Sequence, residues 1–403
     1  MDFSKEALDK LTKAYGSPLY IFNEAGFREN YLDLDRAMRS YYERFHIAYS
    51  FKTNYTPYIC RTAKELGAYA EVVSAMEYFI AKRTGFEDDQ IIFNGPVKGE
   101  AGAKAMGRGC IVNADSLDEV SYLCTAAKAF PSSVFKIGLR VNLDVGQGFV
   151  SRFGIDDIDI PKAFSLAKQA GNLCITGLHC HISRARSLEA WGKRTRKMLE
   201  LADRFIPEGP EFIDLGSGML GSMAPEFAAQ FSDIPTYEQY AQVTAGLISE
   251  HYTGRRGPVI FTEPGTTLIN RFVDCIAKVM AIKMIKGRCF AVLDCGVHTL
   301  GETSTLKRLP ITVIAGGGDR VYCREAAFTG YTCLEQDVMY SGYTGELAIG
   351  DYIVFGNVGG YSNVLKPPFI NPNCAMAAEK PDGTFQLIKT AETFDDLLKT
   401  YLF

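Results

Sequence analysis

Residues 174–215 read CITGLHCHISRARSLEAWGKRTRKMLELADRFIPEGPEFIDL, and this stretch decides the expected fold. The β-prone run Cys174–Ile182 is followed by an amphipathic helical pattern over Trp191–Phe205 and then by a second β-prone run, Glu211–Leu215. Strand, helix and strand in this order predict a βαβ unit, in which the crossover helix makes the two strands parallel.

The same alternation continues through most of the chain. Eight short β-prone runs alternate with longer amphipathic segments, which predicts a (β/α)8 barrel over residues 24–270 and an α/β fold class. The expected strands are Ile47–Phe51, Tyr69–Val73, Gln90–Asn94, Cys110–Asn113, Phe135–Asn142, Cys174–Ile182, Glu211–Leu215 and Pro258–Glu263. The expected helices include Tyr58–Leu66, Met76–Thr84, Leu117–Ala129, Pro161–Gln169, Trp191–Phe205 and Tyr237–Tyr252.

The pattern changes after Glu263. Strand-like runs follow one another with little helix between them, and the Gly-rich stretch Gly316–Asp319 indicates a loop. We therefore expect a second, mostly β domain over residues 271–403. We also expect the N-terminal segment 1–23 to join it, with Pro18–Phe22 as a strand. The other expected strands are Ile276–Ile285, Cys289–Asp294, Ile311–Ile314, Arg320–Cys323 and Tyr352–Phe355.

Composition narrows the class of protein. Hydrophobic residues make up 47% and charged residues 22% of the 403 residues, as in an ordinary globular protein. The net charge of -4 argues against a nucleic-acid partner, because phosphate contacts need an excess of Lys and Arg. No apolar run is long enough for a membrane span, and the polar N-terminus shows no secretory signal, so we expect a cytoplasmic protein. Eleven cysteines without a CxxC pair predict reduced, mostly buried thiols and no disulfide framework.

Side chains able to do chemistry stand at the expected strand ends, where the active sites of such barrels lie. Lys52 ends an apolar run, and a desolvated lysine is a usable nucleophile. The alternative is a lysine that extends into solvent at a strand end. The strand ends carry, in order, Lys52, Glu71 with Ser74, Asn94, Asp115, Arg140, His181, the loop Gly216–Gly221 and Glu263.

Two of these features have competing interpretations. His179 and His181 lie on the same side of one strand, so they suggest a metal site, a ring that stacks on a planar ligand, or core histidines. The other three histidines have no partner at ligand spacing, and we predict no metal. Glu263 could hold a proton on a heterocyclic nitrogen, or it could form a structural ion pair, for example with Arg140.

Gly216–Gly221 is a literal GxGxxG after an expected strand. A dinucleotide site would require a helix to open directly after it, and Pro225 delays any helix. A glycine loop whose bare amides approach a phosphate fits better, since phosphate sites are common after the last strands of such barrels. A plain tight turn is the remaining alternative.

Together these residues resemble the fold-type III pyridoxal-phosphate decarboxylases, a group that includes diaminopimelate, ornithine and carboxynorspermidine decarboxylases and shares its fold with alanine racemase. The resemblance covers nearly the whole chain. It is carried by the segments Tyr49–Asn54, Glu71–Glu77, the Arg140 motif, Gly177–Ile182, Asp214–Gly218, Glu263–Gly265, Thr332–Asp337 and Gly359–Ser362.

The resemblance implies the cofactor pyridoxal 5'-phosphate and a role for each matching residue. Lys52 is the Schiff-base lysine, Glu71 lies near the cofactor, and Arg140 pairs with that acid. His181 stacks on the pyridine ring and Glu263 contacts its nitrogen. The residues that resemble the phosphate and cofactor site are Gly216, Ser217, Gly218, Gly265, Thr266 and Tyr361. Cys333 is the candidate acid that protonates Cα, and in the family it reaches the partner's site, which implies a homodimer with shared active sites.

Glu263 favours decarboxylation over racemisation. A protonated pyridine ring is an electron sink for the carbanion that remains when CO2 leaves, and a neighbouring carboxylate favours the protonated form. Rivals are an amino-acid racemase, a barrel hydrolase with a metal at His179 and His181, and a non-catalytic relative. The last should lack Lys52 or Cys333, and both are present.

Departures from the family pattern concern the phosphate and the substrate. Thr266 stands where an arginine often follows Glu-Pro-Gly, and Arg184 or Arg186 could replace it. Leu334 stands where ornithine and diaminopimelate enzymes carry an acid after the cysteine, and leucine cannot pair with an ammonium group. Asp294–Thr299 also lacks the arginine that grips the distal carboxylate of diaminopimelate. We therefore predict a non-standard or conjugated amino acid as substrate, with diaminopimelate or carboxynorspermidine as the alternative. The candidate substrate-binding residues are Arg184, His298, Glu335, Asp337 and Tyr361.

Overall fold

The computed structural model describes residues 3–146 and 148–403. The chain divides into two compact units. We call residues 28–221 and 233–267 the barrel unit. The β-rich unit comprises the residues up to Phe27 together with 222–232 and 268–403. No helix among the described residues is long and apolar enough to cross a membrane.

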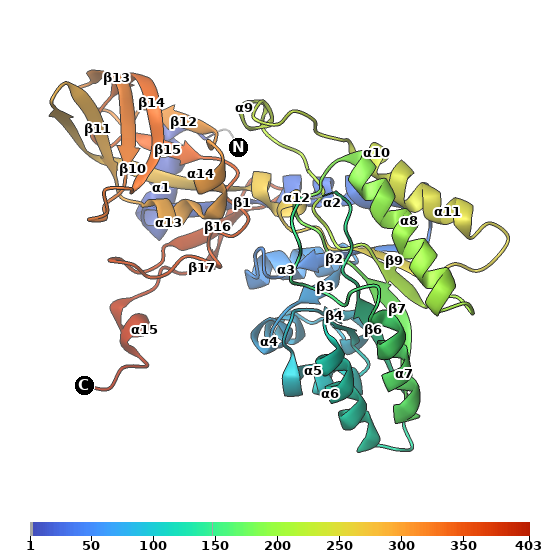
Figure 1. Ribbon diagram of the computed structural model, residues 1–403. Helices are drawn as coiled ribbons and strands as arrows, with labels where there is room; N and C mark the ends of the chain where they lie inside the picture. Colours follow the sequence, from blue (N-terminus) through green and yellow to red (C-terminus); the bar gives the residue numbers. More distant parts are fainter. Residues whose placement is uncertain (1–2, 147) are drawn as a thin grey trace. The chain divides into compact units, whose positions relative to one another are not determined.

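The barrel unit contains a closed barrel of eight parallel strands in chain order, as the sequence predicted (Figure 1). The ring closes where β2 pairs with β9, with Phe45 opposite Ile260. The strands are β2 (Phe45–Ser50), β3 (Tyr69–Val72), β4 (Ile91–Phe93), β5 (Ile111–Ala114), β6 (Phe135–Arg140), β7 (Leu173–His179), β8 (Phe212–Asp214) and β9 (Val259–Thr262).

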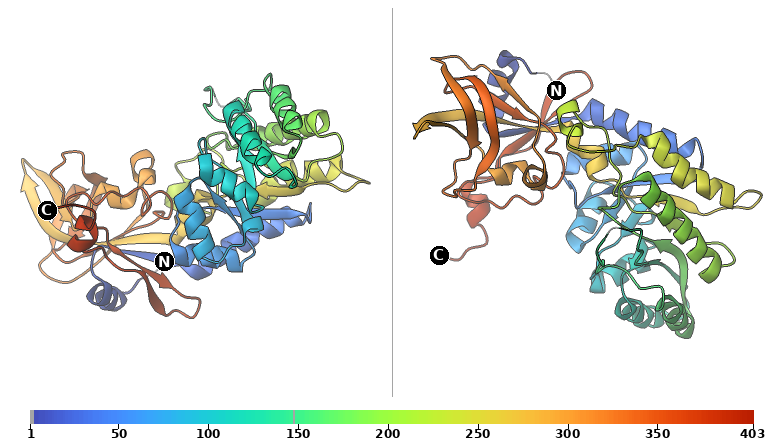
Figure 2. Two further views of the ribbon diagram at one scale, coloured as in Figure 1. Left: turned by 90° about the horizontal axis from the view of Figure 1, so that it is seen from below. Right: turned by 45° about the horizontal axis from the view of Figure 1, so that its top comes forward.

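Helices cover the outside of these strands (Figures 1 and 2). They are α2 (Glu24–Arg39), α3 (Pro57–Glu65), α4 (Ala75–Arg83), α5 (Gly99–Gly107), α6 (Leu117–Lys128), α7 (Ile160–Ala170), α8 (Leu188–Phe205), α10 (Tyr237–Ala241), α11 (Leu247–His251) and α12 (Thr266–Ile269). Short helices of other types are η1 (Asp88–Gln90) and η2 (Gln242–Gly246), whereas η3 (Asn270–Phe272) belongs to the β-rich unit. The stretch from α10 through η2 to α11 forms one nearly continuous helix where the sequence predicted Tyr237–Tyr252.

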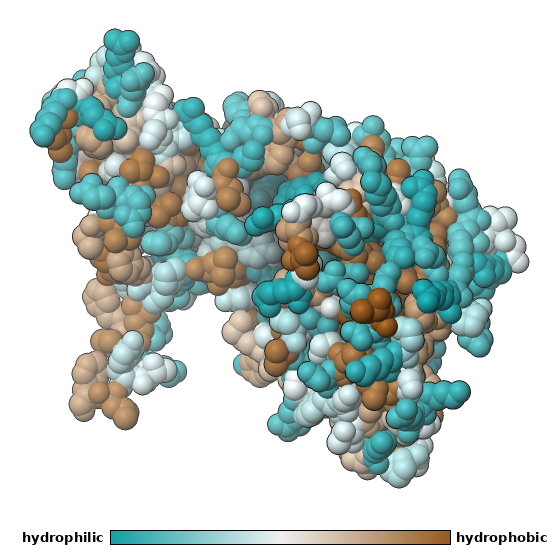
Figure 3. All heavy atoms as spheres, viewed as in Figure 1, coloured by the Kyte–Doolittle hydropathy of each residue, from teal (hydrophilic) through white to brown (hydrophobic). Residues whose placement is uncertain are grey.

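Helix α8 shows how the sequence produces this layer. The Ser187 hydroxyl oxygen accepts a hydrogen bond from the amide of Ala190 and so caps the first turn. Trp191, Met198 and Leu201 are buried on one face of the helix, as an amphipathic pattern requires. Figure 3 shows hydrophilic side chains predominating on the surface of this part of the unit.

The barrel interior is apolar where Phe212 and Phe261 meet edge to face, with ring centroids 6.2 Å apart. Together with Ala48 and Ile92 these rings form a buried cluster. A Cβ atom at Gly177 would lie 2.3 Å from the Phe212 ring, so only glycine leaves room for it. The strands therefore end in polar residues above a closed apolar layer.

The β-rich unit is built on a nine-stranded sheet. Strand β1 (Leu19–Asn23) comes from the N-terminal segment and pairs with β10 (Val273–Ile285) and β16 (Ala375–Glu379). The other strands are β11 (Arg288–Leu293), β12 (Ile311–Ile314), β13 (Val321–Thr329), β14 (Val338–Leu347), β15 (Tyr352–Phe355) and β17 (Phe385–Lys389). The helices of this unit are α1 (Lys5–Tyr15), α9 (Pro225–Ala228), α13 (Val297–Leu300), α14 (Glu302–Leu306) and α15 (Phe394–Leu398).

One cysteine prediction was wrong. Cys289 and Cys323 form a disulfide, whereas we expected only reduced thiols. The two residues lie on β11 and β13, which are neighbours in the sheet, and their Cα atoms are 5.9 Å apart, a separation that a disulfide spans. The remaining nine cysteines are free, and Cys174 and Cys333 are the exposed ones among them.

Candidate active site

The carboxyl ends of the barrel strands gather a buried polar cluster. Glu71, Asn94 and Glu263 follow or end β3, β4 and β9, and each is at most 3% exposed. Burial of carboxylates is unfavourable unless hydrogen bonds or charges compensate it, so such a cluster marks a functional-site candidate. Lys52 lies two residues beyond β2, at the same end of the barrel.

Lys52 forms an ion pair with Glu71. The side chain of Lys52 is 28% exposed, so its amine is reachable, whereas that of Glu71 is buried. Ser50 donates a hydrogen bond of 2.7 Å to the same carboxylate, and Asn94 donates one of 3.2 Å to its other oxygen. Glu71 therefore fixes the position of the lysine and can accept its proton.

Glu263 is contacted by two imidazoles and one amide. His181 Nδ1 lies 3.0 Å from Oε2 of Glu263, His179 Nε2 lies 3.2 Å from Oε1, and Asn94 donates to Oε1. Burial alone would raise the pKa of Glu263, but His179 and His181 outweigh it and hold the pKa well below its ordinary value. Burial lowers the pKa of His181, which favours the neutral ring. The site thus offers a buried carboxylate that stays ionised.

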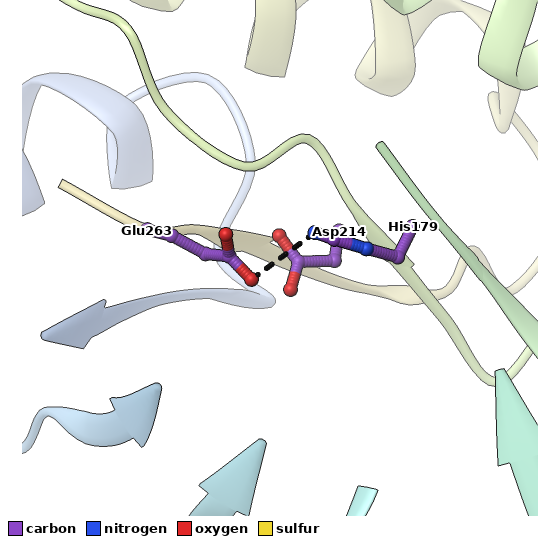
Figure 4. A group of neighbouring side chains, drawn as sticks. All are labelled: His179, Asp214 and Glu263. Carbon is purple, nitrogen blue, oxygen red and sulfur yellow. Dashed lines mark ion pairs between the residues drawn. The ribbon is translucent and has the colours of Figure 1, made fainter. Parts of the chain in front are cut away.

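Asp214 completes the group shown in Figure 4. It ends β8, opposite His179 in the register with β7, and Oδ1 accepts a 2.8 Å hydrogen bond from the amide of Gly216. Burial and the neighbouring Glu263 raise the pKa of Asp214 well above its ordinary value. The ligand atoms of His179, Asp214 and Glu263 lie within 4.8 Å of one another, which is close enough to hold a metal ion.

The pairing that we expected for Arg140 was wrong. Its Nη1 donates a 2.8 Å hydrogen bond to Asp115, and its guanidinium lies over the Phe153 ring at 4.6 Å. Asp115 follows β5 and Arg140 ends β6, which are adjacent strands, whereas Glu71 follows from β3. The carboxylate of Glu71 has Lys52 as its cation instead.

The glycine loop after β8 allows a close backbone approach. Gly216 and Gly218 adopt φ of +60° and +105°, in the region that favours glycine. A Cβ at Gly216 would lie 2.4 Å from the carbonyl oxygen of Cys180, and one at Gly218 would lie 2.3 Å from that of Ile182. The amide of Ser217 donates towards His181 Nδ1 at 3.4 Å. This loop therefore lies directly on the chain segment that follows β7.

Gly265 and Thr266 complete the predicted cofactor residues of the barrel unit. A Cβ at Gly265 would lie 2.0 Å from Oγ1 of Thr53, so the turn after Glu263 packs against the chain just after Lys52. Thr266 begins α12. Arg184 is exposed, and its guanidinium lies 5.7 Å from the centre of the Phe149 ring.

These features fit pyridoxal phosphate. The cofactor needs an accessible amine, a carboxylate for its ring nitrogen and backbone amides for its phosphate. Lys52, Glu263 and the Gly218 amide of the glycine loop supply these three groups in one unit. The amide of Gly218 donates to no described residue, which leaves that donor for a ligand.

The loop between β13 and β14 carries Cys333 in the β-rich unit. Cys333 is exposed, and the loop around it is held by Asp337. Asp337 is 3% exposed and accepts hydrogen bonds from the Val297 amide at 2.7 Å and from Thr332 Oγ1 at 2.6 Å. We expected Asp337 to bind substrate. Its oxygens accept hydrogen bonds from its own unit, and these contacts hold the cysteine loop in place.

The other candidates in the β-rich unit remain accessible. Glu335 and His298 are exposed, and the His298 ring lies edge-on to Phe369 at 5.8 Å. Tyr361 is half-buried, with φ of +56°.

Sequence reasoning did not place two residues beside Glu263. It quoted Asp214 only as the start of the glycine motif, and it considered His179 as a metal ligand, as a ring that stacks on a planar ligand or as a core histidine. Both lie at strand ends beside Glu263, so the register of β7, β8 and β9 is the signal that identifies them.

A parallel eight-stranded barrel with a lysine, buried carboxylates and a glycine loop at its strand ends defines a barrel enzyme with the site of a phosphate-bearing aldehyde cofactor. Comparison with known proteins identifies the family. Residues 30–270 match the model of the pyridoxal-dependent decarboxylase, pyridoxal binding domain. The chain belongs to this family, and it is a pyridoxal-phosphate-dependent amino-acid decarboxylase.

Relatives match over nearly their whole length. Diaminopimelate decarboxylase of Methanothermobacter thermautotrophicus is 27% identical over 97% of this chain and 92% of that protein. The structure of diaminopimelate decarboxylase from M. jannaschii with L-lysine has a TM-score of 0.86 at 23% identity, covering 98% of this chain and 94% of the other. Lysine decarboxylase from Selenomonas ruminantium gives a TM-score of 0.76 at 22% identity, covering 95% of this chain and 98% of the other. These structures share the fold of this chain.

Proposed function

We propose that this chain removes CO2 from Cα of an amino acid that is not a standard diamino acid, with Lys52 as the residue that links to the cofactor. The observation that carries the proposal is the position of the Lys52 amine, accessible at a strand end and held by the buried Glu71. Bound pyridoxal phosphate supplies an electron sink for the electron pair released when the carboxylate leaves.

The residues of the barrel unit divide the remaining work. Glu71 accepts the proton that Lys52 must lose before its nitrogen can attack a carbonyl carbon. Glu263 stays ionised and holds a proton on an aromatic ring nitrogen, while neutral His181 offers a flat face beside it. Gly216, Ser217 and Gly218 form the glycine loop proposed to hold the phosphate, with the amide of Gly218 as its free donor, and Tyr361 is the candidate from the β-rich unit.

Cys333 is proposed as the acid that returns a proton to Cα after CO2 has left. It is exposed, and Asp337 fixes its loop, as a proton donor that must reach a substrate requires. We further propose a homodimer in which Cys333 serves the site of the partner subunit. Large exposed apolar side chains in the β-rich unit support self-association, including Phe394 at 71% and Ile349 at 63% exposed.

The substrate is the part of the proposal in which this chain departs from its named relatives. Leu334 follows Cys333 directly and offers no charge to a distal ammonium group. With Asp337 buried, Glu335, His298 and Arg184 remain as polar side chains for recognition. The alternatives are carboxynorspermidine and diaminopimelate, the latter being the substrate in the name of the diaminopimelate decarboxylases among its relatives. A screen of amino acids for CO2 release, with conjugated and carboxylated ones included, decides between them. We propose a cytoplasmic location.

Racemisation is the second candidate reaction. An ionised Glu263 argues against it, because a protonated ring nitrogen favours loss of CO2 over simple return of the Cα proton. Release of CO2 in step with substrate loss separates the two reactions, since a racemase releases none.

Reduction with borohydride tests the link to Lys52. The purified protein is expected to be yellow, and mass spectrometry after reduction should find the cofactor on Lys52. Lys52→Ala should abolish both the link and turnover. Lys136→Ala is the matched control, because Lys136 is exposed near the start of β6 and pairs with Glu211. Attachment to any other lysine would refute the assignment.

A further inference from the structure

Arg194 is a buried cation beneath the glycine loop. It lies on α8 and is fully buried. Its Nη1 donates to the carbonyl oxygens of Leu215 and Ser217, and its Nη2 donates to that of Ile182, each at 2.9 Å. One side chain therefore joins the loop after β8 to the segment after β7.

The surroundings of Arg194 do not neutralise it. Within the described part of the chain its guanidinium has no carboxylate at ion-pair distance, and it stacks on the Trp191 ring with a separation of 4.0 Å. A buried guanidinium is unfavourable unless its donors are used and a negative charge lies nearby. The three carbonyls accept from Nη1 and Nη2, whereas Nε is buried without a hydrogen-bond partner among the described residues. The charge therefore still lacks an anion close to the loop.

The geometry of the peptide bond shows where that anion binds. In a trans peptide the C=O and N–H groups point in opposite directions. The carbonyl of Ile182 shares its peptide with the amide of Ser183, and that of Ser217 shares its peptide with the amide of Gly218. Since Arg194 holds both carbonyls, both N–H groups point away from it. Neither amide donates to any described residue.

We propose that Arg194 is a positioning residue that holds the amides of Ser183 and Gly218 ready for the phosphate of the cofactor. Two such amides on adjacent loops form an anion-binding nest, and the buried charge behind them polarises both peptides towards it. This role compensates for Thr266, which stands where related sequences often have an arginine. The inference rests on the proposed function, because it assumes that pyridoxal phosphate binds at this loop.

The test compares two ligands that differ only in the phosphate. Full-length apoprotein is titrated with pyridoxal 5'-phosphate and with pyridoxal, and binding is followed by absorbance and protein fluorescence. Arg194→Met keeps the length of the side chain but removes the charge and the donors. We expect it to weaken pyridoxal 5'-phosphate binding by about tenfold to a hundredfold, the worth of one or two charge-assisted hydrogen bonds, with pyridoxal binding unchanged.

Controls separate this role from a structural one. Arg196→Met removes an exposed arginine of the same helix and should alter neither affinity. If circular dichroism shows that Arg194→Met does not fold, Arg194→Lys is tested in its place, because lysine keeps the charge but lacks the planar set of guanidinium donors. The same comparison applies, namely the loss of affinity for pyridoxal 5'-phosphate against that for pyridoxal. An equal loss for both ligands, or no loss, would overturn the role of Arg194. Wild-type protein that binds neither ligand would instead refute the proposed function.

Discussion

Glu77 is a buried acid in the first turn of α4 whose ionisation should destabilise the barrel unit. Its residue is 5% exposed, and Oε2 accepts a 2.7 Å hydrogen bond from the amide of Val73. Burial raises the pKa of Glu77 from 4.5 to about 7, against the opposing effect of the Val73 amide. The folded protein therefore binds a proton at this position more tightly than the unfolded chain.

The sign of the pH effect follows from this shift. A folded-state pKa above the unfolded value gives stability that is complete below pH 4.5 and lost as the pH rises through about 7. Between about pH 5 and pH 8 the loss amounts to about 2 to 3 kcal/mol for this group. Glu77→Gln cannot ionise, and its amide oxygen can still accept from the Val73 amide.

Urea denaturation at about pH 5 and about pH 8 measures the effect, because the free energy of unfolding is obtained at each pH. The difference in the free energy of unfolding between Glu77→Gln and the wild type should shift in favour of the variant by about 2 to 3 kcal/mol from the lower to the higher pH. Glu208→Gln, at an exposed position, is the matched control and should show no shift. If the free energy of unfolding changed with pH in Glu77→Gln as it does in the wild type, the argument from burial would be refuted.

Two further predictions concern Cys333. Cys333→Ala should fold and bind the cofactor with an unchanged absorbance spectrum. Its turnover should be lower than that of the wild type by about a hundredfold or more, because a positioned acid contributes at least that factor. Unchanged turnover measured by CO2 release would remove Cys333 from the mechanism. Mixing inactive Lys52→Ala and Cys333→Ala chains should restore part of the activity, because a shared dimer then holds one intact site; failure with proven subunit exchange would show that each site is made by one chain.

The barrel could be predicted because its signal is local. Each strand is a short apolar run between helical patterns, and β2 to β9 lie within a few residues of their predicted positions. Strand β16 has the sequence AMAAE, and alanine has little β-propensity of its own. Its pairing with β1, more than 350 residues away, makes it a strand, and no local pattern reports that pairing.

Side-chain pairs between strands also depend on which strands are neighbours in the fold, and no local pattern in the sequence reports this. Arg140 meets Asp115 because β5 and β6 are adjacent, although the resemblance pointed to Glu71. Cys289 and Cys323 meet because β11 and β13 pair in the sheet, although β12 lies between them in the sequence. No sequence pattern indicated the contacts of Arg194, because its partners are backbone carbonyls, which every residue has.

Charge balance in the barrel unit explains why a ring cation belongs beside Glu263. Three of the carboxylates that the unit buries belong to the cluster at the strand ends, those of Glu71, Asp214 and Glu263. Lys52 neutralises Glu71, and the raised pKa of Asp214 favours its uncharged form. Glu263 is then the carboxylate of the three that stays ionised with imidazoles in place of a Lys or Arg partner, because His179 and His181 hold its pKa low. A buried anion stabilises a protonated heterocyclic nitrogen more than a neutral one, because the charged pair replaces the lost hydration. The fold therefore favours the strongly electron-withdrawing form of the cofactor, the form that loss of CO2 requires and that a racemase has reason to avoid.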